Sequence, residues 1–253
     1  MTMELLREGA DDLGLTLSPK HIEMFERYYH ELKKWNDRFN LTAITGYQEV
    51  QVKHFLDSLS CFLAFPGGTV GPLPNRIPLQ LDRRHIRCMD VGSGGGFPGL
   101  ALKVLAPDIR MTLVDSTRKK VGFIRHMIEV LELEDAEAIH ARAEELGQAP
   151  QHREQYDIVL ARAVAHLPIL CEYCLPLCRV GGRMIALKGQ EAHEEAEASQ
   201  EALDVLGGTL VEIKSVTLPI LGSGHHLIAI DKTAPTPKKY PRRPGMPEKR
   251  PLS

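Results

Sequence analysis

The segment Asp90–Gly99, with the sequence DVGSGGGFPG, constrains the fold more than any other part of the chain. The apolar run that begins at Ile86 predicts a buried parallel strand before it, and Leu100–Leu105 predicts a helix after it. Glycines allow a sharp turn from strand to helix, with no Cβ between the backbone and a ligand at the helix N-terminus. The pattern therefore predicts a nucleotide-cofactor site.

Two cofactor motifs fit these glycines. Gly94, Gly96 and Gly99 match G-x-G-x-x-G, the dinucleotide fingerprint. Asp90 and Gly92, with Gly94 and Gly96, match D-x-G-x-G-x-G, the first motif of S-adenosylmethionine methyltransferases. The glycines predict the kind of site and leave both ligands open.

A second strand, predicted at Met111–Val114, is followed by Asp115. An acid at the carboxyl end of this strand, about 20 residues after the glycines, can accept hydrogen bonds from the hydroxyls of a ribose. NAD and S-adenosylmethionine both carry such a ribose. Asp115 therefore supports a nucleotide cofactor without choosing between them.

The chain resembles the family of small-subunit ribosomal RNA methyltransferase G, also called glucose-inhibited division protein B. The matching stretches follow one another along nearly the whole chain: Trp35-Asn36, Asn40–Ile44, His54–Leu59, Asp90–Gly99, Val114–Lys120, Ala143-Glu144, Asp157–Ala165, Leu187–Gly189 and Tyr240–Gly245. The resemblance implies transfer of a methyl group from S-adenosylmethionine to N7 of a specific guanine, guanine-527, in the 530 loop of 16S rRNA, with S-adenosylhomocysteine as the product.

The resemblance also implies which residues bind the cofactor: Asp90, Gly92, Gly94, Phe97, Asp115, Ser116, Thr117, Ala143, Glu144 and Arg162. The glycine loop with Phe97 would contact the methionine part, Asp115–Thr117 would hold the ribose, and Ala143-Glu144 would lie beside the adenine. Arg162 is assigned to the cofactor, although contact with an RNA phosphate or with guanine O6 is an open alternative.

The chemistry of the predicted reaction needs no general base, because guanine N7 carries a lone pair and no proton. Catalysis would then consist of aligning the nucleophile, the methyl group and the sulfur. We therefore predict no proton-transfer residue, and no metal. His54 and Asp57 are expected to lie near each other on a helix, where they face the substrate or where His54 bonds to the backbone.

The basic residues of the chain are concentrated at its C-terminus. Lys232–Ser253 holds seven Lys or Arg and one acid, a net charge of 7 − 1 = +6, so residues 1–231 carry −2 − 6 = −8. Six prolines argue against a helix in this tail, and cations on a stiff extended chain suit an RNA backbone, with Tyr240 free to stack on a base. The predicted RNA-binding residues are Lys188, Lys238, Lys239, Arg242 and Arg243. The alternative is a disordered solubilising tail.

Alternating strands and helices predict an α/β fold of the Rossmann-like class I methyltransferase type. The sheet should have seven mostly parallel strands, near 87–91, 110–115, 136–140, 157–161, 183–188, 209–216 and 225–231, the last two forming an antiparallel edge. Helices near 98–106, 118–132, 167–178 and 191–206 should cover both faces. The expected organisation is an N-terminal helical cap at 1–65, in which Ser18-Pro19 starts a helix, a proline-rich insertion at 66–84, the methyltransferase domain at 85–231, and the basic tail at 232–253.

The 253 residues, 43% hydrophobic and 25% charged, suffice for a full α/β core. No apolar run approaches a bilayer span and the five cysteines suggest reduced thiols, so we expect a cytoplasmic monomer. Cys171, Cys174 and Cys178 are expected to pack in the core from one helical face. The partner would be 16S rRNA, in the small ribosomal subunit or in an assembly intermediate. The alternatives are a nicotinamide-dependent oxidoreductase and a non-catalytic RNA-binding protein of ribosome assembly.

Overall fold

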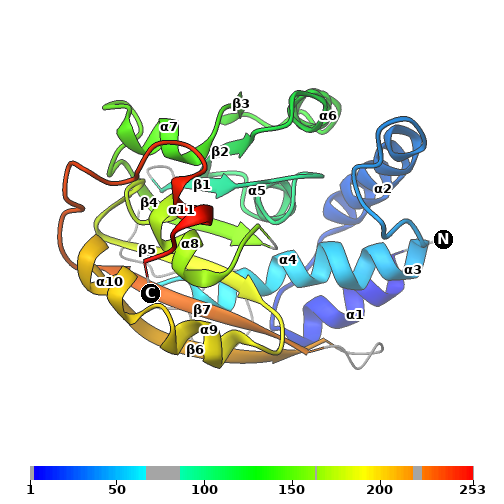
Figure 1. The fold of residues 1–253 in the computed structure, drawn as a ribbon. Coiled ribbons are helices and arrows are strands. Elements are labelled where there is room, and N and C mark those ends of the chain that lie inside the picture. Colours follow the sequence, from blue (N-terminus) through cyan, green and yellow to red (C-terminus); the bar gives the residue numbers. More distant parts are fainter. Residues whose placement is uncertain (1–2, 67–85, 163, 219–223, 253) are drawn as a thin grey trace.

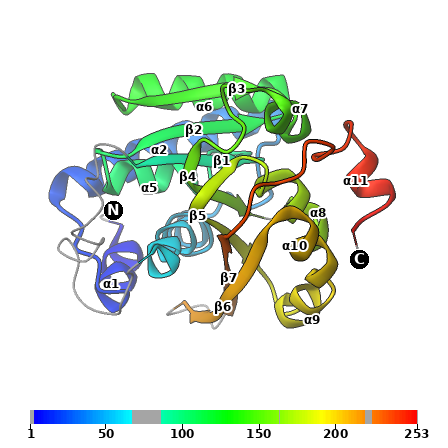
Figure 2. The same cartoon turned by 90° about the vertical axis from the view of Figure 1, so that its left-hand side faces the viewer.

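The computed structural model of the protein describes residues 3–66, 86–162, 164–218 and 224–252 (Figures 1 and 2). Apart from Pro66, the predicted insertion lies outside the described residues. The helices are α1 (Glu4–Asp12), α2 (Pro19–Phe39), α3 (Tyr47–Val50), η1 (Gln51–Leu56), α4 (Asp57–Leu59), η2 (Ser60–Ala64), α5 (Gly99–Leu105), α6 (Arg118–Val130), α7 (Ala143–Gln148), α8 (Leu167–Cys174), α9 (Ala192–Glu197), α10 (Gln200–Leu206) and α11 (Met246–Lys249). The strands are β1 (Arg87–Val91), β2 (Arg110–Asp115), β3 (Ala136–His140), β4 (Tyr156–Arg162), β5 (Cys178–Lys188), β6 (Gly208–Thr217) and β7 (Gly224–Lys232).

The seven strands form one sheet in the order β3-β2-β1-β4-β5-β7-β6. Strands β1 to β5 run parallel to one another, whereas β7 is antiparallel to both of its neighbours. The predicted Rossmann-like sheet with an antiparallel edge is therefore confirmed. Because the first five strands share one direction, their carboxyl ends meet along one edge, which is where ligands bind in open α/β sheets.

Successive residues of each strand enter two different cores. On β1, Cys88 packs with the N-terminal helices, α5 and α6, whereas Met89 packs with α7 to α10. Leu160 and Ala161 divide in the same way on β4. This alternation follows from the two-residue period of a strand, and helices accordingly cover both faces of the sheet (Figure 1).

The N-terminal helices share a core with the sheet. Ser18 caps α2 by accepting a hydrogen bond from the backbone N–H of His21, and Pro19 occupies the first turn, as predicted. Buried side chains of α2 such as Phe25 and Leu32 belong to the same cluster as Leu100 of α5. The helical cap is thus packed against the sheet through its own apolar face.

Two helix predictions need correction, and one helix was not predicted. The helix predicted at 167–178 ends at Cys174, so Cys178 lies on β5 and not on the same helix, although all five cysteines are buried free thiols. The helix predicted at 191–206 is broken between α9 and α10, where the Ser199 hydroxyl donates to the Glu195 carbonyl at 2.6 Å. The short helix α7 was not predicted.

The C-terminal segment also differs from the prediction. Lys232 is the last residue of β7 and is buried, and the proline-rich stretch contains a helical turn, α11, which begins after Gly245 at a φ of 79°. Pro247 is accommodated because proline fits the first turn of a helix. No helix among the described residues is both long and apolar enough to cross a membrane.

Candidate cofactor site

The glycine loop follows β1 and is hydrogen-bonded to the end of β2. The backbone N–H groups of Gly92 and Ser93 both donate to the carbonyl of Val114, at 2.8 and 3.0 Å. Gly92 has a φ of 73°, and a Cβ built on it would lie 2.6 Å from Val164 Cγ2. A side chain at Gly92 would therefore be strained and would also collide with its neighbour.

Asp90 holds the start of α5 from beneath the loop. Its Oδ2 accepts a hydrogen bond from the Gly99 N–H at 2.9 Å, whereas its buried Oδ1 has no partner. Burial disfavours the charged form and raises the pKa of Asp90 to about 7. Asp90 therefore fixes the start of α5 from a fully buried position under the loop.

Asp115 lies at the carboxyl end of β2, 5% exposed. Its two carboxylate oxygens accept hydrogen bonds from the backbone N–H groups of Gly94 and Thr117, at 3.0 and 2.7 Å. These two bonds fix the carboxylate against the loop. Each oxygen keeps a further lone pair, which suits the two hydroxyls of a ribose.

A pocket of about 100 Å³ opens beside these groups at the carboxyl edge of the sheet. Five predicted residues line it: Gly92, Asp115, Ser116, Ala143 and Glu144. It is also lined by residues that were not predicted: Val91, Val114, Ala141, Arg142, Val164, Tyr173 and Glu248. Arg142 could have been found from its place before Ala143-Glu144, but no local pattern marks Tyr173 or Glu248.

Asp90, Gly94 and Thr117 support the pocket without lining it. Gly94 and Thr117 contact Asp115 through their backbones, and Thr117 takes the N-cap position of α6 with no side-chain cap bond. Gly94 and Thr117 therefore position Asp115, whereas Asp90 positions the start of α5 through Gly99.

Phe97 and Arg162 do not line this pocket, and their contact with the cofactor stays a prediction. The Phe97 ring is 4% exposed and is stacked between Tyr28 and His54, at centroid distances of 5.2 and 4.5 Å. Arg162 donates to Asp57 Oδ2 at 2.8 Å, with its guanidinium 5.2 Å from the Phe97 ring centroid. Both are drawn towards the N-terminal helices because aromatic rings and a carboxylate there complement them.

His54 and Asp57 belong to this second cluster. Burial, assisted by the charge of Arg162, lowers the pKa of His54 to about 3, so that its ring stays neutral. Nδ1 of His54 lies 3.1 Å from the carbonyl of Lys53, which favours the backbone-bonded alternative. Asp57 also lies 3.0 Å from His225 Nδ1 at the start of β7.

The cations predicted to bind RNA divide into two groups. Lys188 and Arg242 are engaged inside the protein: Lys188 Nζ lies 2.6 Å from Glu195, and Arg242 Nε donates to Glu172 at 2.9 Å. Lys238, Lys239 and Arg243 are exposed. Tyr240, expected to stack on a base, is 8% exposed and packs with the core on the α8 side of the sheet.

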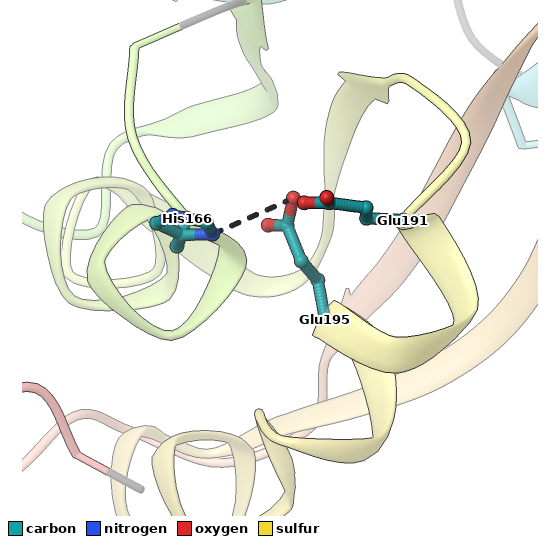
Figure 3. A group of neighbouring side chains, drawn as sticks. All are labelled: His166, Glu191 and Glu195. Atoms are coloured by element: carbon teal, nitrogen blue, oxygen red, sulfur yellow. Dashed lines mark ion pairs between the residues drawn. The ribbon is translucent and has the colours of Figure 1, made fainter.

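His166, Glu191 and Glu195 approach one another beyond the end of β5, with one potential ligand atom of each within 4.8 Å of the others (Figure 3). Glu195 is already engaged, because it accepts from the backbone N–H of Leu167 at 2.6 Å and pairs with Lys188. This carboxylate therefore serves the N-terminus of α8.

Comparisons with known proteins identify the family. The model of the family described as rRNA small subunit methyltransferase G matches residues 21–223. The chain belongs to this family. A ribosomal RNA small subunit methyltransferase G from Pelotomaculum thermopropionicum is 49% identical over 249 residues, covering 98% of each chain. A protein of the same name from Halalkalibacterium halodurans is 45% identical over 253 residues, covering 100% of each chain.

The polar groups around the pocket fit the cofactor that the family resemblance implies, S-adenosylmethionine. Asp115 offers acceptors for a ribose, Glu144 offers an acceptor for the adenine amino group, and the glycine loop lets the ligand approach the backbone. The volume of about 100 Å³ is below the ~300 Å³ at the lower end of ligand sites, so a cofactor of this size would extend beyond this pocket.

Proposed function

We propose that this protein transfers the methyl group of S-adenosylmethionine to N7 of guanine-527 in the 530 loop of 16S rRNA. The observation that carries the proposal is the meeting of Gly92, Asp115 and Glu144 in one pocket at the carboxyl ends of β1, β2 and β3. Membership of the rRNA small subunit methyltransferase G family supports the RNA substrate.

The sheet topology favours methyl transfer over hydride transfer from a nicotinamide. Dinucleotide-binding Rossmann sheets have the parallel strand order 3-2-1-4-5-6. Here the antiparallel strand β7 is inserted between β5 and β6. The glycines alone are compatible with both NAD and S-adenosylmethionine. The inserted antiparallel strand favours S-adenosylmethionine.

The protein's part in the reaction is to bind and to align. S-adenosylmethionine, when bound, supplies a methyl group on a positively charged sulfur, and guanine N7 attacks it without losing a proton. Asp115 and the glycine loop would hold the nucleoside of the cofactor at the carboxyl edge of the sheet. Orientation of this kind can lower the barrier by several kcal/mol, roughly 7 to 11 in well-aligned systems.

We expect the protein to act as a cytoplasmic monomer on the small ribosomal subunit or on an assembly intermediate. The exposed cations Lys238, Lys239 and Arg243 are available for RNA phosphates. Arg162 and Asp57 lie beside the edge of the sheet where the guanine would approach.

The test is methylation of small subunits from a strain that lacks this modification. Incubation with labelled S-adenosylmethionine, followed by nuclease digestion and mass spectrometry of the rRNA, should place one 7-methylguanosine at position 527. Naked 16S rRNA and assembly intermediates, assayed in parallel, should identify the preferred substrate. Tight NADH binding without methyl transfer would favour the oxidoreductase, and RNA retention without turnover would favour the assembly protein.

A further inference from the structure

The C-terminal segment leaves β7 and ends in α11, on the side of the molecule where α7 and α8 lie (Figure 2). Specific contacts hold it to the body. The Arg242 backbone N–H and its Nε donate to Glu172 Oε1 at 2.8 and 2.9 Å, and the side chain of Glu172 is 1% exposed. Arg153 donates to the carbonyls of Thr236 and Tyr240, both at 2.7 Å. A segment of charge +6 thus docks on a body of charge −8.

Helix α7 is shaped to receive this segment. A Cβ built on Gly147 would lie 2.7 Å from Cγ of Pro241, so only a glycine lets the two surfaces meet as they do. Gln148 Nε2 donates to the carbonyl of Pro241 at 2.7 Å. Because α7 also carries Glu144, the docked segment lies directly beside one wall of the pocket.

Two contacts extend from the docked segment into the pocket itself. The Gly245 N–H donates to Oε1 of the buried Glu144 at 2.9 Å, and Glu248 of α11 lines the pocket together with Tyr173. The Tyr173 hydroxyl donates to Glu248 Oε1 at 3.1 Å. Burial and the nearby carboxylates raise the pKa of Tyr173, so the phenol remains a donor.

We propose that the segment Arg242–Glu248 is a fixed wall at the adenine end of the cofactor pocket, in which Gly245 orients Glu144 and Glu248 supplies a second acceptor for the adenine amino group. This inference rests on the proposed function, since it assumes an adenine nucleoside in the pocket. Ionised carboxylates only accept hydrogen bonds, so two of them select a base with an amino group, such as adenine, over one with a carbonyl oxygen in its place.

The proposal gives the tail a role at the cofactor pocket, in addition to the RNA contacts that its charge predicts. Gly245 donates to the pocket residue Glu144, and Glu248 lines the pocket. Arg242 forms an ion pair with Glu172. Loss of this segment should therefore directly lower the affinity of the protein for the cofactor.

The experiment measures S-adenosylhomocysteine binding by calorimetry to the full chain, to a chain ending at Pro244, to Glu248→Gln and to Lys249→Ala. Loss of hydrogen bonds to charged acceptors should weaken binding about tenfold to a hundredfold in the shortened chain, and about tenfold in Glu248→Gln. Lys249→Ala is the matched control on the same exposed helical turn and should bind within about twofold of wild type. Melting curves without ligand report the fold.

An analogue separates a specific contact from a merely structural effect. S-inosylhomocysteine carries an oxygen in place of the adenine amino group, so the wild type should bind it less well than S-adenosylhomocysteine, and Glu248→Gln should lose part of that preference. If Glu248→Gln and the shortened chain keep the wild-type affinity and the wild-type preference for S-adenosylhomocysteine, the proposed wall at the adenine end is refuted. The proposed function would remain intact. If the wild type binds neither compound, the proposed function fails first. If the shortened chain does not fold, Glu248→Gln decides.

Discussion

The ribose end of the pocket is built from residues close together in the sequence, whereas the adenine end joins segments far apart. The hydrogen bond from Gly94 to Asp115 spans 21 positions, and the one from Gly245 to Glu144 spans 101. One continuous stretch of chain, the β1–loop–α5–β2 unit, contains the whole of the first end. The second exists only after the C-terminal segment has docked, so the two ends should respond differently to mutation.

The largest effect is expected at the locally built end. Gly92→Val places a branched side chain at a φ of 73° and against Val164, so cofactor binding should fall by about a hundredfold or more. Calorimetry with S-adenosylmethionine measures the loss, and circular dichroism checks the fold. Gly122→Ala is the control, because its Cβ would enter open space on α6. A folded Gly92→Val protein with wild-type affinity would refute close contact between loop and ligand.

The far end depends on the pair Arg242–Glu172, and here we expect an effect on stability. Arg242→Met leaves the buried Glu172 carboxylate unpaired and should lower the free energy of unfolding by about 3 kcal/mol. Urea denaturation measures it. Arg243→Met, at the exposed neighbour, should change it by less than about 0.5 kcal/mol. Equal effects of the two variants would mean that the segment is not anchored through this pair.

This difference also explains what the sequence could and could not predict. The apolar runs and the glycine turn specify β1, β2 and the loop, because the information is local and follows strand and turn chemistry. The cations of the tail have no visible partners in the sequence, so its charge suggested RNA. Glu172, which neutralises Arg242, lies 70 positions away on a helix whose buried face reads as apolar. The stacking of Phe97 on Tyr28 and His54 could not be predicted for the same reason, because these partners are distant in the sequence.

The raised pKa of Asp90, which lies beneath the glycine loop, predicts that the stability of the fold depends on pH. Its pKa in the folded protein is about 7 against an ordinary value of 3.8, so the folded state holds the proton more tightly than the unfolded state does. This contribution to stability is complete below about pH 4 and is lost as the pH rises through 7, a fall of roughly 2 to 4 kcal/mol. Asp90→Asn resembles the protonated form and should flatten that slope in urea titrations between pH 5 and 8. Asp108→Asn, an exposed control, should leave the slope as it is in the wild type.

At the ribose itself the expected effect is smaller. Asp115→Ala removes two acceptor oxygens and should cost about 1.5 to 3 kcal/mol of S-adenosylmethionine affinity. Asp115→Asn keeps one acceptor and should lose less. Calorimetry on both variants, together with Glu248→Gln, compares the two ends directly. Wild-type affinity in Asp115→Ala would remove the ribose assignment.

The smallest effect concerns the cations of the C-terminal segment that remain exposed. Lys238 and Lys239 lie on the stretch between β7 and the docked Tyr240, and they can contact phosphates without disturbing the pocket. If both bind looped RNA, the slope of log K against log salt should flatten by at most about 1.4 in the double variant Lys238→Ala/Lys239→Ala, since each phosphate contact contributes about 0.7. Binding to small subunits over a range of salt concentrations measures the slope, and S-adenosylmethionine affinity should not change. Lys33→Ala/Lys34→Ala on α2 makes the same change in net charge elsewhere. A slope equal to that of the wild type would mean that the C-terminal segment serves the cofactor pocket and not RNA. The RNA-binding surface would then be assigned to the edge of the sheet near Arg162.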